Sequence, residues 1–332
     1  MKLLKNKDKE ILNIALPAIV ANITVPLLGL VDVAITGHLG NAAYIAAIAV
    51  GSMLFNVIYW VFGFLRMGTS GMTAQAYGRG DSAETMLLLM RGLCVALAVA
   101  LAVIVLQRPL LALAISVMGV EPSLQPLVRT YFQICVWGAP AMLCLYAFTG
   151  WFIGLQNTRI TMTVSIVQNI VNIVASLVLV YGLGMKIDGV ATGTLIAQWG
   201  GLLVAASYAC LKHRGLLRSL SLRAVTRGEA LMRFFNVNRD IFLRTLFLVA
   251  VNLFFVSAGA TQGTVVLAVN TLLMQLFTLF SYVMDGFAYA GEALCGKYAG
   301  AGDRTGFHAT VRRLFVWGAI LTTAYTAVYA LG

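Results

Sequence analysis

Three carboxylates stand inside long apolar stretches of this chain. Asp32 lies among leucines, glycines and valines in "NITVPLLGLVDVAITGHLG", and Asp285 and Glu292 are seven residues apart in a later stretch, which places them on one helix face. An acid at the centre of a bilayer costs about 2.5–3.5 kcal/mol on insertion scales, so such residues usually serve a function. We expect Asp32 to be a working acid and Asp285 to line a cavity. For Glu292 the alternative is a position near the inner membrane surface.

The helix that carries Asp32 contains features that would let it bend. Pro17 and Pro26 each remove a backbone donor and favour a kink. Gly29, one turn before Asp32, would let a neighbouring helix or a ligand come close. The sequence therefore predicts a moving helix whose acid takes and releases a proton.

A stripe of polar side chains in a later apolar stretch could supply partners for that acid. Asn169, Asn172 and Ser176 in "IVQNIVNIVASLVL" share one helix face, and Thr194 lies in the next stretch. Polar residues in membrane helices often only link helices, at about 0.6–2 kcal/mol each. Their number on one face favours a polar cavity.

The composition identifies an integral membrane protein. The 332 residues are 60% hydrophobic and 11% charged, whereas about a quarter of a soluble domain is charged. We expect an all-α polytopic fold, because backbone amides are not left unpaired in lipid. About nine apolar runs are long enough to span: 11–36, 45–67, 86–106, 127–152, 160–183, 190–211, 241–260, 265–290 and 314–331.

The net charge of +11 encodes orientation in this chain. With the N-terminus in the cytoplasm, every basic residue falls on the cytoplasmic side except Arg108, Arg129 and Lys186. We therefore expect a multi-pass protein of the inner membrane with a cytoplasmic N-terminus, and no nucleic-acid partner. No span carries a nucleophile and base that would make an enzyme site.

An internal repeat organises the chain. A shift of 222 residues lays 37–81 on 259–303, where "AYGRGD" meets "YAGAGD" after equally long apolar runs. Six spans separate the copies, so they share one orientation and their axis follows the membrane normal. We expect an N-lobe of six spans at 1–211, a cytoplasmic linker at 212–240 and a C-lobe of about three spans at 241–332.

The chain resembles the multidrug and toxic compound extrusion (MATE) family, and within it the DinF-type branch. The resemblance rests on "ALPAIVANITVPLLGLVDVAITGHLG", "FLRMGTSGMTAQAYGRGD", "GWFIGLQNTR", "QNIVNIV" and "MDGFAYAGEALCGKYAG", in this order. It implies a two-lobe antiporter of twelve helices that exports small organic, often cationic or amphipathic, compounds across the bilayer. Against nine spans, the last three helices of the family would be absent.

The resemblance also implies roles for individual residues. The acid of the family's first helix falls on Asp32, the Asn of its fifth on Asn172, and a Thr of its sixth on Thr194. Ser176 stands where many relatives have a second Asp, which favours H⁺ over Na⁺ as the coupling ion; no other cofactor is expected. Two alternatives remain: a lipid-linked-precursor flippase of the same superfamily, and a truncated membrane protein that does not transport.

Overall fold

The regular structure of the chain is helical throughout the part that a computed structural model describes, residues 2–38, 41–215, 222–225, 228–261 and 264–331. This confirms the all-α class. The elements are α1 (Lys2–Gly37), α2 (Ala42–Val61), α3 (Phe64–Gly78), α4 (Ser82–Val105), α5 (Gln107–Val117), α6 (Gln125–Cys135), the 3₁₀ turn η1 (Val136–Gly138), α7 (Ala139–Gly154), α8 (Thr158–Leu177), the π-helical turn η2 (Val178–Gly182), α9 (Ile187–Lys212), α11 (Leu222–Val225), α12 (Gly228–Thr261), α13 (Thr264–Gly300) and α14 (Arg304–Leu331).

Each predicted span overlaps one or more of these helices. Among the described residues, seven helical segments are long and apolar enough to cross a membrane: Ala42–Gly78, Ser82–Val105, Gln125–Gly154, Thr158–Gly182, Ile187–Lys212, Leu272–Gly300 and Arg304–Leu331. The predicted spans 11–36 and 241–260 lie in α1 and α12, which have 36 and 34 residues and are therefore each about 50 Å long.

Two boundaries differ from the sequence prediction. The predicted span 45–67 is interrupted at Phe62, where the backbone leaves the helical region (ψ 6°), and the helix restarts as α3. The predicted linker 212–240 contains α11 and the first part of α12, because α12 already begins at Gly228; residues 216–221 and 226–227 of the linker lie outside the described residues.

The two copies of the repeat have the same turn after their second span. Gly80 and Gly302 have φ angles of 74° and 70°, a left-handed conformation that favours glycine. Asp81 and Asp303 then cap the next helix, each accepting a hydrogen bond from the amide three residues later at 2.9 and 2.8 Å. The predicted register of 222 residues is therefore confirmed at these turns.

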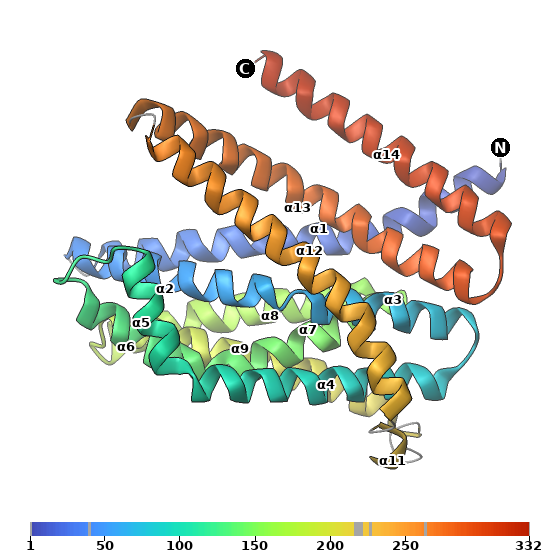
Figure 1. Ribbon diagram of the computed structural model, residues 1–332, viewed down its shortest axis with the longest axis horizontal. Helices are drawn as coiled ribbons and strands as arrows, with labels where there is room; N and C mark the ends of the chain where they lie inside the picture. The colour runs from blue at the N-terminus through green and yellow to red at the C-terminus, as the bar shows by residue number, and fades with distance from the viewer. Residues whose placement is uncertain (1, 39–40, 216–221, 226–227, 262–263, 332) are drawn as a thin grey trace.

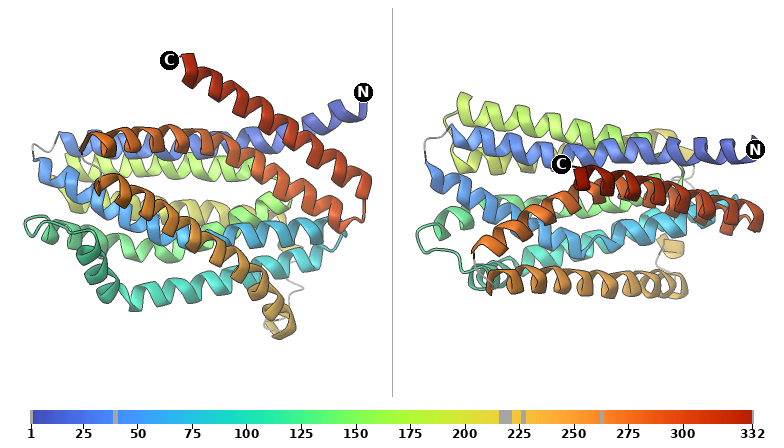
Figure 2. Two further views of the ribbon diagram at one scale, coloured as in Figure 1. Left: turned by 45° about the horizontal axis from the view of Figure 1, so that its top comes forward. Right: turned by 90° about the horizontal axis from the view of Figure 1, so that it is seen from above.

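Both turns lie with the N-terminus at one end of the bundle, on the right in Figure 1, which we call the N-terminal end. Helices α1 to α9 run mostly along the long axis, and α12 crosses in front of them. Figure 2 shows α13 and α14 beside α1, and α13 also packs on α3 and α12. The second copy is thus laid against α1 and α3 of the first.

A pseudo-two-fold axis passes between α3 and α13. Ala74 and Gly296 occupy equivalent positions of the repeat and lie against each other, so that a Cβ on Gly296 would be 2.6 Å from the Cβ of Ala74. Equivalent residues that touch mark a two-fold axis. Both helices run in the same direction, so this axis follows the bundle, as the repeat predicts.

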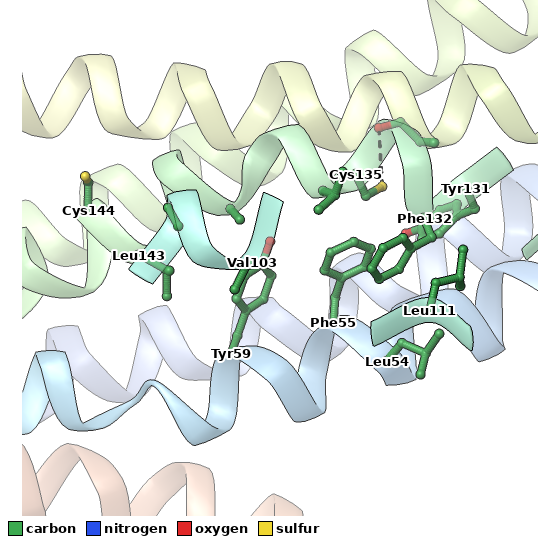
Figure 3. Close-up of a cluster of buried hydrophobic side chains, with 14 of the residues drawn as sticks. Leu54, Phe55, Tyr59, Val103, Leu111, Tyr131, Phe132, Cys135, Leu143 and Cys144 are labelled. Carbon is green, nitrogen blue, oxygen red and sulfur yellow. Dashed lines mark hydrogen bonds between the residues drawn. The ribbon is translucent and has the colours of Figure 1, made fainter. Parts of the chain in front are cut away.

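A large apolar core holds α2, α6 and α9 together. Phe55 of α2 stacks on Phe132 of α6 with ring centroids 4.9 Å apart, as Figure 3 shows, and such pairs add about 0.5–1.5 kcal/mol to burial. Cys135 of α6 lies 3.7 Å from the carbonyl oxygen of Ala191 in α9, the dashed contact in Figure 3. These contacts fix the helices that surround Asp32.

Candidate functional site

Helices α1 and α8 run side by side in a fixed register. Polar side chains of α8 and η2 donate hydrogen bonds to carbonyl oxygens of α1, namely Thr158 to Ile14 at 2.9 Å, Asn169 to Thr24 at 3.2 Å and Tyr181 to Ile35 at 3.4 Å. The partners are 144, 145 and 146 residues apart. This register places Asp32 at the level of Ser176, with Asn172 about one turn away.

Asp32 is half-buried, and one of its carboxylate oxygens has no partner. Its Oδ1 is buried and receives no hydrogen bond, and the described residues give Asp32 no ion pair. Tyr131 and Cys135 of α6 lie within electrostatic range of this carboxylate. A carboxylate with neither a cation nor a full set of donors is free to bind a proton or another cation.

The polar stripe of α8 faces α9 at the same level. Asn172 donates from Nδ2 to Thr194 Oγ1 at 3.1 Å, and Thr194 donates to the carbonyl of Val190 at 3.1 Å. Ser176 is fully buried against Gly193. The Oδ1 of Asn172 and the Oγ of Ser176 are both buried without a partner.

These oxygens are buried at the same level along the bundle as Asp32, and each can accept a hydrogen bond. An ionised carboxylate only accepts hydrogen bonds, whereas a protonated one also donates. Protonation of Asp32 would therefore supply a donor that the free oxygens of Asn172 and Ser176 lack. No cluster of three metal-binding His, Cys, Asp or Glu side chains occurs in the described residues.

The structure shows neither a break at the two prolines of α1 nor a close neighbour at Gly29. Helix α1 continues through Pro17 and Pro26 without a break. A Cβ on Gly29 would meet nothing within 4 Å, so the predicted close approach of a neighbouring helix is not present. Asn169 links α8 to α1, because its Nδ2 donates to the carbonyl oxygen of Thr24.

The other two acids lie in a second cluster around Arg66 of α3. Arg66 is 3.4 Å from Glu292 Oε2 and 4.1 Å from the ring centre of Tyr289, both on α13. Asp285 lies within electrostatic range of the guanidinium, but its side chain is exposed. Glu292 and Asp285 therefore lie around Arg66, whereas Asp32 has no ion pair among the described residues.

Arg66 corrects one expectation drawn from the sequence, which places it with the basic residues at the cytoplasmic surface. Its side chain is only 13% exposed, and it lies twelve residues before Gly78, about 18 Å along the helix from the N-terminal end. The predicted span ends at residue 67, whereas α3 continues to Gly78, so Arg66 lies far from the C-terminal end of its helix and not at the membrane surface.

Sequence reasoning missed four residues that lie near Asp32 or in the cluster around Arg66, namely Tyr131, Cys135, Arg66 and Tyr289. Tyr131 and Cys135 are four residues apart on one face of α6, a spacing that could have revealed them. Arg66 and Tyr289 come from segments far apart in the chain, and their pairing needed the fold.

Comparison with known proteins agrees with this architecture. The family model MatE matches residues 17–178. DNA damage-inducible protein F of Escherichia coli is 36% identical over 333 residues, covering 100% of this chain and 72% of that protein. The probable multidrug resistance protein NorM of Shewanella oneidensis is 30% identical over 205 residues, covering 60% of this chain and 44% of that protein.

Solved structures share the fold. A crystal structure of MATE in the bent conformation superposes with a TM-score of 0.87 at 21% identity, covering 98% of this chain and 73% of that one. The sequence match along the whole chain, the repeat and the shared fold lead to one conclusion: this chain belongs to the MATE family of multi-pass membrane transporters.

Proposed function

We propose that this protein exports small organic, cationic or amphipathic compounds in exchange for H⁺, with Asp32 as the residue that carries the proton. The observation that supports this role is the buried Asp32 Oδ1, which has no hydrogen-bond partner and lies at the level of two more unpaired oxygens on α8. A site of this kind changes its hydrogen bonding when one proton arrives.

The mechanism we propose moves α1. With the site open to the outside, Asp32 takes a proton and its carboxyl group donates to Asn172 Oδ1 or Ser176 Oγ. Helix α1 then bends near Pro26, where a backbone donor is already missing, and the substrate site collapses. Release of the proton towards the cytoplasm resets the helix. One titration thereby biases an element with two arrangements.

The orientation that we propose places the N-terminal end in the cytoplasm of a cell with an inner membrane. Arg79, Lys297 and Arg304 lie at that end, beside the α3–α4 and α13–α14 turns. Arg108 and Lys186 belong to α5 and the start of α9, at the opposite end. This distribution follows the positive-inside rule.

The test uses purified protein in liposomes and follows drug efflux under a pH gradient. Asp32→Asn keeps the shape of the side chain but removes the titration, and we expect coupled efflux to fall to the level of empty liposomes. Asp188→Asn, an exposed acid at the start of α9, is the matched control and should transport normally. Full coupled efflux by Asp32→Asn would reject the proposal.

The choice between H⁺ and Na⁺ has its own experiment. Ser176 contributes a neutral hydroxyl where a carboxylate would add a negative charge for Na⁺. We expect a Na⁺ gradient without a pH gradient to drive no efflux in the wild type, and Ser176→Asp to gain Na⁺-driven efflux. Na⁺-driven efflux by the wild type would assign the coupling to Na⁺.

A flippase for a large anionic cargo is the second candidate, because Arg66 is a buried cation. Glu292 at 3.4 Å offsets its charge, and Tyr289 covers one face, so the cluster is not a basic cavity. We therefore expect that organic cations will inhibit the efflux of a fluorescent cation and that lipid-linked anions will not. Competition by the anionic lipid alone would favour the flippase. Wild-type protein that moves neither cargo would support the non-transporting alternative.

A further inference from the structure

Two arginines occupy the same position in the two copies of the repeat. Arg91 of α4 and Arg313 of α14 each lie ten residues after the aspartate that caps their helix, and they are 222 residues apart, the register of the repeat. Each lies on the helix that follows the capped turn at the N-terminal end. Arg313 contacts the first helix of the other copy, and Arg91 contacts α11, which precedes the other copy's first helix.

Arg91 holds the segment that enters α12. Its side chain is 3% exposed, and it donates to the carbonyl oxygens of Val225 at 3.3 Å and Ala224 at 3.2 Å, both in α11. Glu84, two turns earlier on α4, accepts the remaining contact at 2.8 Å and balances the charge. The segment α11, which precedes the second copy's first helix, is thereby tied to α4 of the first copy.

Arg313 makes the reciprocal connection to the first turns of α1. Its Nε donates to Asp8 Oδ1 at 2.7 Å and its Nη2 to Asp8 Oδ2, a bidentate pair. Trp317, one turn further along α14, donates to the same carboxylate at 3.1 Å. The start of the first copy's first helix is thereby tied to the third helix of the second copy.

We propose that Arg91 and Arg313 are positioning residues for alternating access: each holds the entry to the other copy's first helix while the N-terminal end is closed, and both release it when that end opens. The two arginines are equivalent positions of the repeat, so a separation of the copies at this end acts on both contacts. The proposal rests on transport by the family and not on the coupling role of Asp32.

The physical reason for this proposal is that the contacts of Arg91 and Arg313 are each either formed or broken. An arginine as buried as Arg91 needs hydrogen-bond acceptors, and it loses carbonyl partners unless α11 moves with it or water replaces them. The bidentate geometry of Arg313 and Asp8 is likewise either formed or broken. Contacts of this kind are suited to switching between two states.

The test is a reversible cross-link across each contact in liposomes, with Cys94, Cys210 and Cys295, the cysteines that are not buried, replaced by alanine. The pairs are Asp8→Cys with Arg313→Cys, and Arg91→Cys with Val225→Cys, joined by a short thiol-specific linker that a reductant cleaves. The readout is exchange of a fluorescent organic cation down its own gradient, which needs no ion coupling. We expect linking of either pair to abolish exchange and reduction to restore it.

The matched control is a pair within one helix, Arg312→Cys and Val316→Cys, which are exposed on α14. The same linker there spans one turn and constrains no other element, so exchange should continue. Full exchange with the Asp8–Arg313 or Arg91–Val225 pair linked would overturn the proposal.

Single substitutions provide a second measurement in case a cysteine pair does not fold. Asp8→Asn, Arg313→Gln and Arg91→Gln each weaken a contact of the closed state, so substrate offered from the N-terminal end should half-saturate exchange at a lower concentration. Arg91→Lys should restore part of the wild-type value, and Arg312→Gln should match it. An unchanged half-saturating concentration in all three weakened variants would contradict the proposal.

Discussion

Gly78 of α3 and Gly300 of α13, equivalent positions of the repeat, each lie directly against a backbone carbonyl of the other copy. Gly78 faces the carbonyl oxygen of Lys297, and Gly300 faces that of Gln75. Lys297 and Gln75 are themselves equivalent, so the two contacts are exchanged by the same pseudo-two-fold operation. Glycine at both positions is what lets the two helices meet backbone to backbone at the N-terminal end.

Alanine at these glycines should therefore destabilise the protein. A Cβ at either position would overlap a carbonyl oxygen, and overpacking of this kind costs about 1–3 kcal/mol. We expect Gly78→Ala and Gly300→Ala to lower the thermal unfolding temperature in detergent. Gly71→Ala, in the same helix α3, is the control, because its Cβ would meet nothing within 4 Å. Equal stability of Gly78→Ala and Gly71→Ala would show that this contact is looser than described.

The packing of α9 on α8 gives a prediction about the site itself. A Cβ on Gly193 would overlap Ser176 Oγ and crowd its backbone, so Gly193→Ala should push α9 away from α8 and stretch the bond from Asn172 to Thr194. We expect drug efflux from liposomes to be lost. In Gly200→Ala the nearest atom would be Val171 Cγ1 at 3.7 Å, an ordinary contact, and efflux should persist. Normal efflux by Gly193→Ala would remove this interface from the proposed mechanism.

The signals that single out Asp32, Asn172 and Ser176 in the sequence are local. Asn172 and Ser176 lie on one face through helical spacing alone, and the cost of burying Asp32 marked it regardless of its neighbours. The repeat was visible because the turns at Gly80 and Gly302 need the same unusual backbone conformation. The open space around Gly29 was not predictable, because a glycine in sequence does not show whether a helix approaches it.

The second cluster could not be predicted because its partners are distant in the chain. Arg66 and Glu292 are 226 residues apart, and only the packing of α3 on α13 brings them together. A count of apolar residues also does not reveal the break at Phe62, which moves Arg66 from the expected membrane surface to the interior. The second copy has no such break, since α13 continues through the equivalent residues.

The contact between Asp8 and Arg313 should make stability depend on pH. Hydrogen bonding to Arg313, and then to Trp317, lowers the pKa of the Asp8 carboxyl below its usual value of 3.8. A lowered pKa means that the stabilisation is present above the pKa of the unfolded chain and is lost as the pH falls through the folded value. Nearby, Lys7, Glu10 and Tyr298 contact one another and do not bond to Asp8.

We therefore expect Asp8→Asn to lower the thermal unfolding temperature at neutral pH. The difference from the wild type should shrink as the pH falls below 3.8, where the unfolded chain takes up the proton, and should vanish below the lowered pKa of the folded protein. Thermal unfolding in detergent across this range measures it. A difference that is constant down to strong acid would mean that shape, and not charge, accounts for the contact.

The pairing of Arg66 with Glu292 gives a prediction about energetic coupling. Their side chains are 13% and 25% exposed, so the removal of one partner leaves a largely buried charge without compensation, at a cost of about 2–4 kcal/mol. Arg66→Met and Glu292→Met should each destabilise the protein, whereas the double variant leaves no isolated charge and should lose less than the sum of the two. Thermal unfolding of the four proteins gives the coupling energy.

The same cycle on Arg239 and Asp240, whose side chains are 66% and 73% exposed, should give a coupling near zero because solvent screens the pair. Additive losses at Arg66 and Glu292 would mean that the guanidinium finds water or Asp285 when Glu292 is removed, and the cluster would then be an open polar site instead of a closed ion pair.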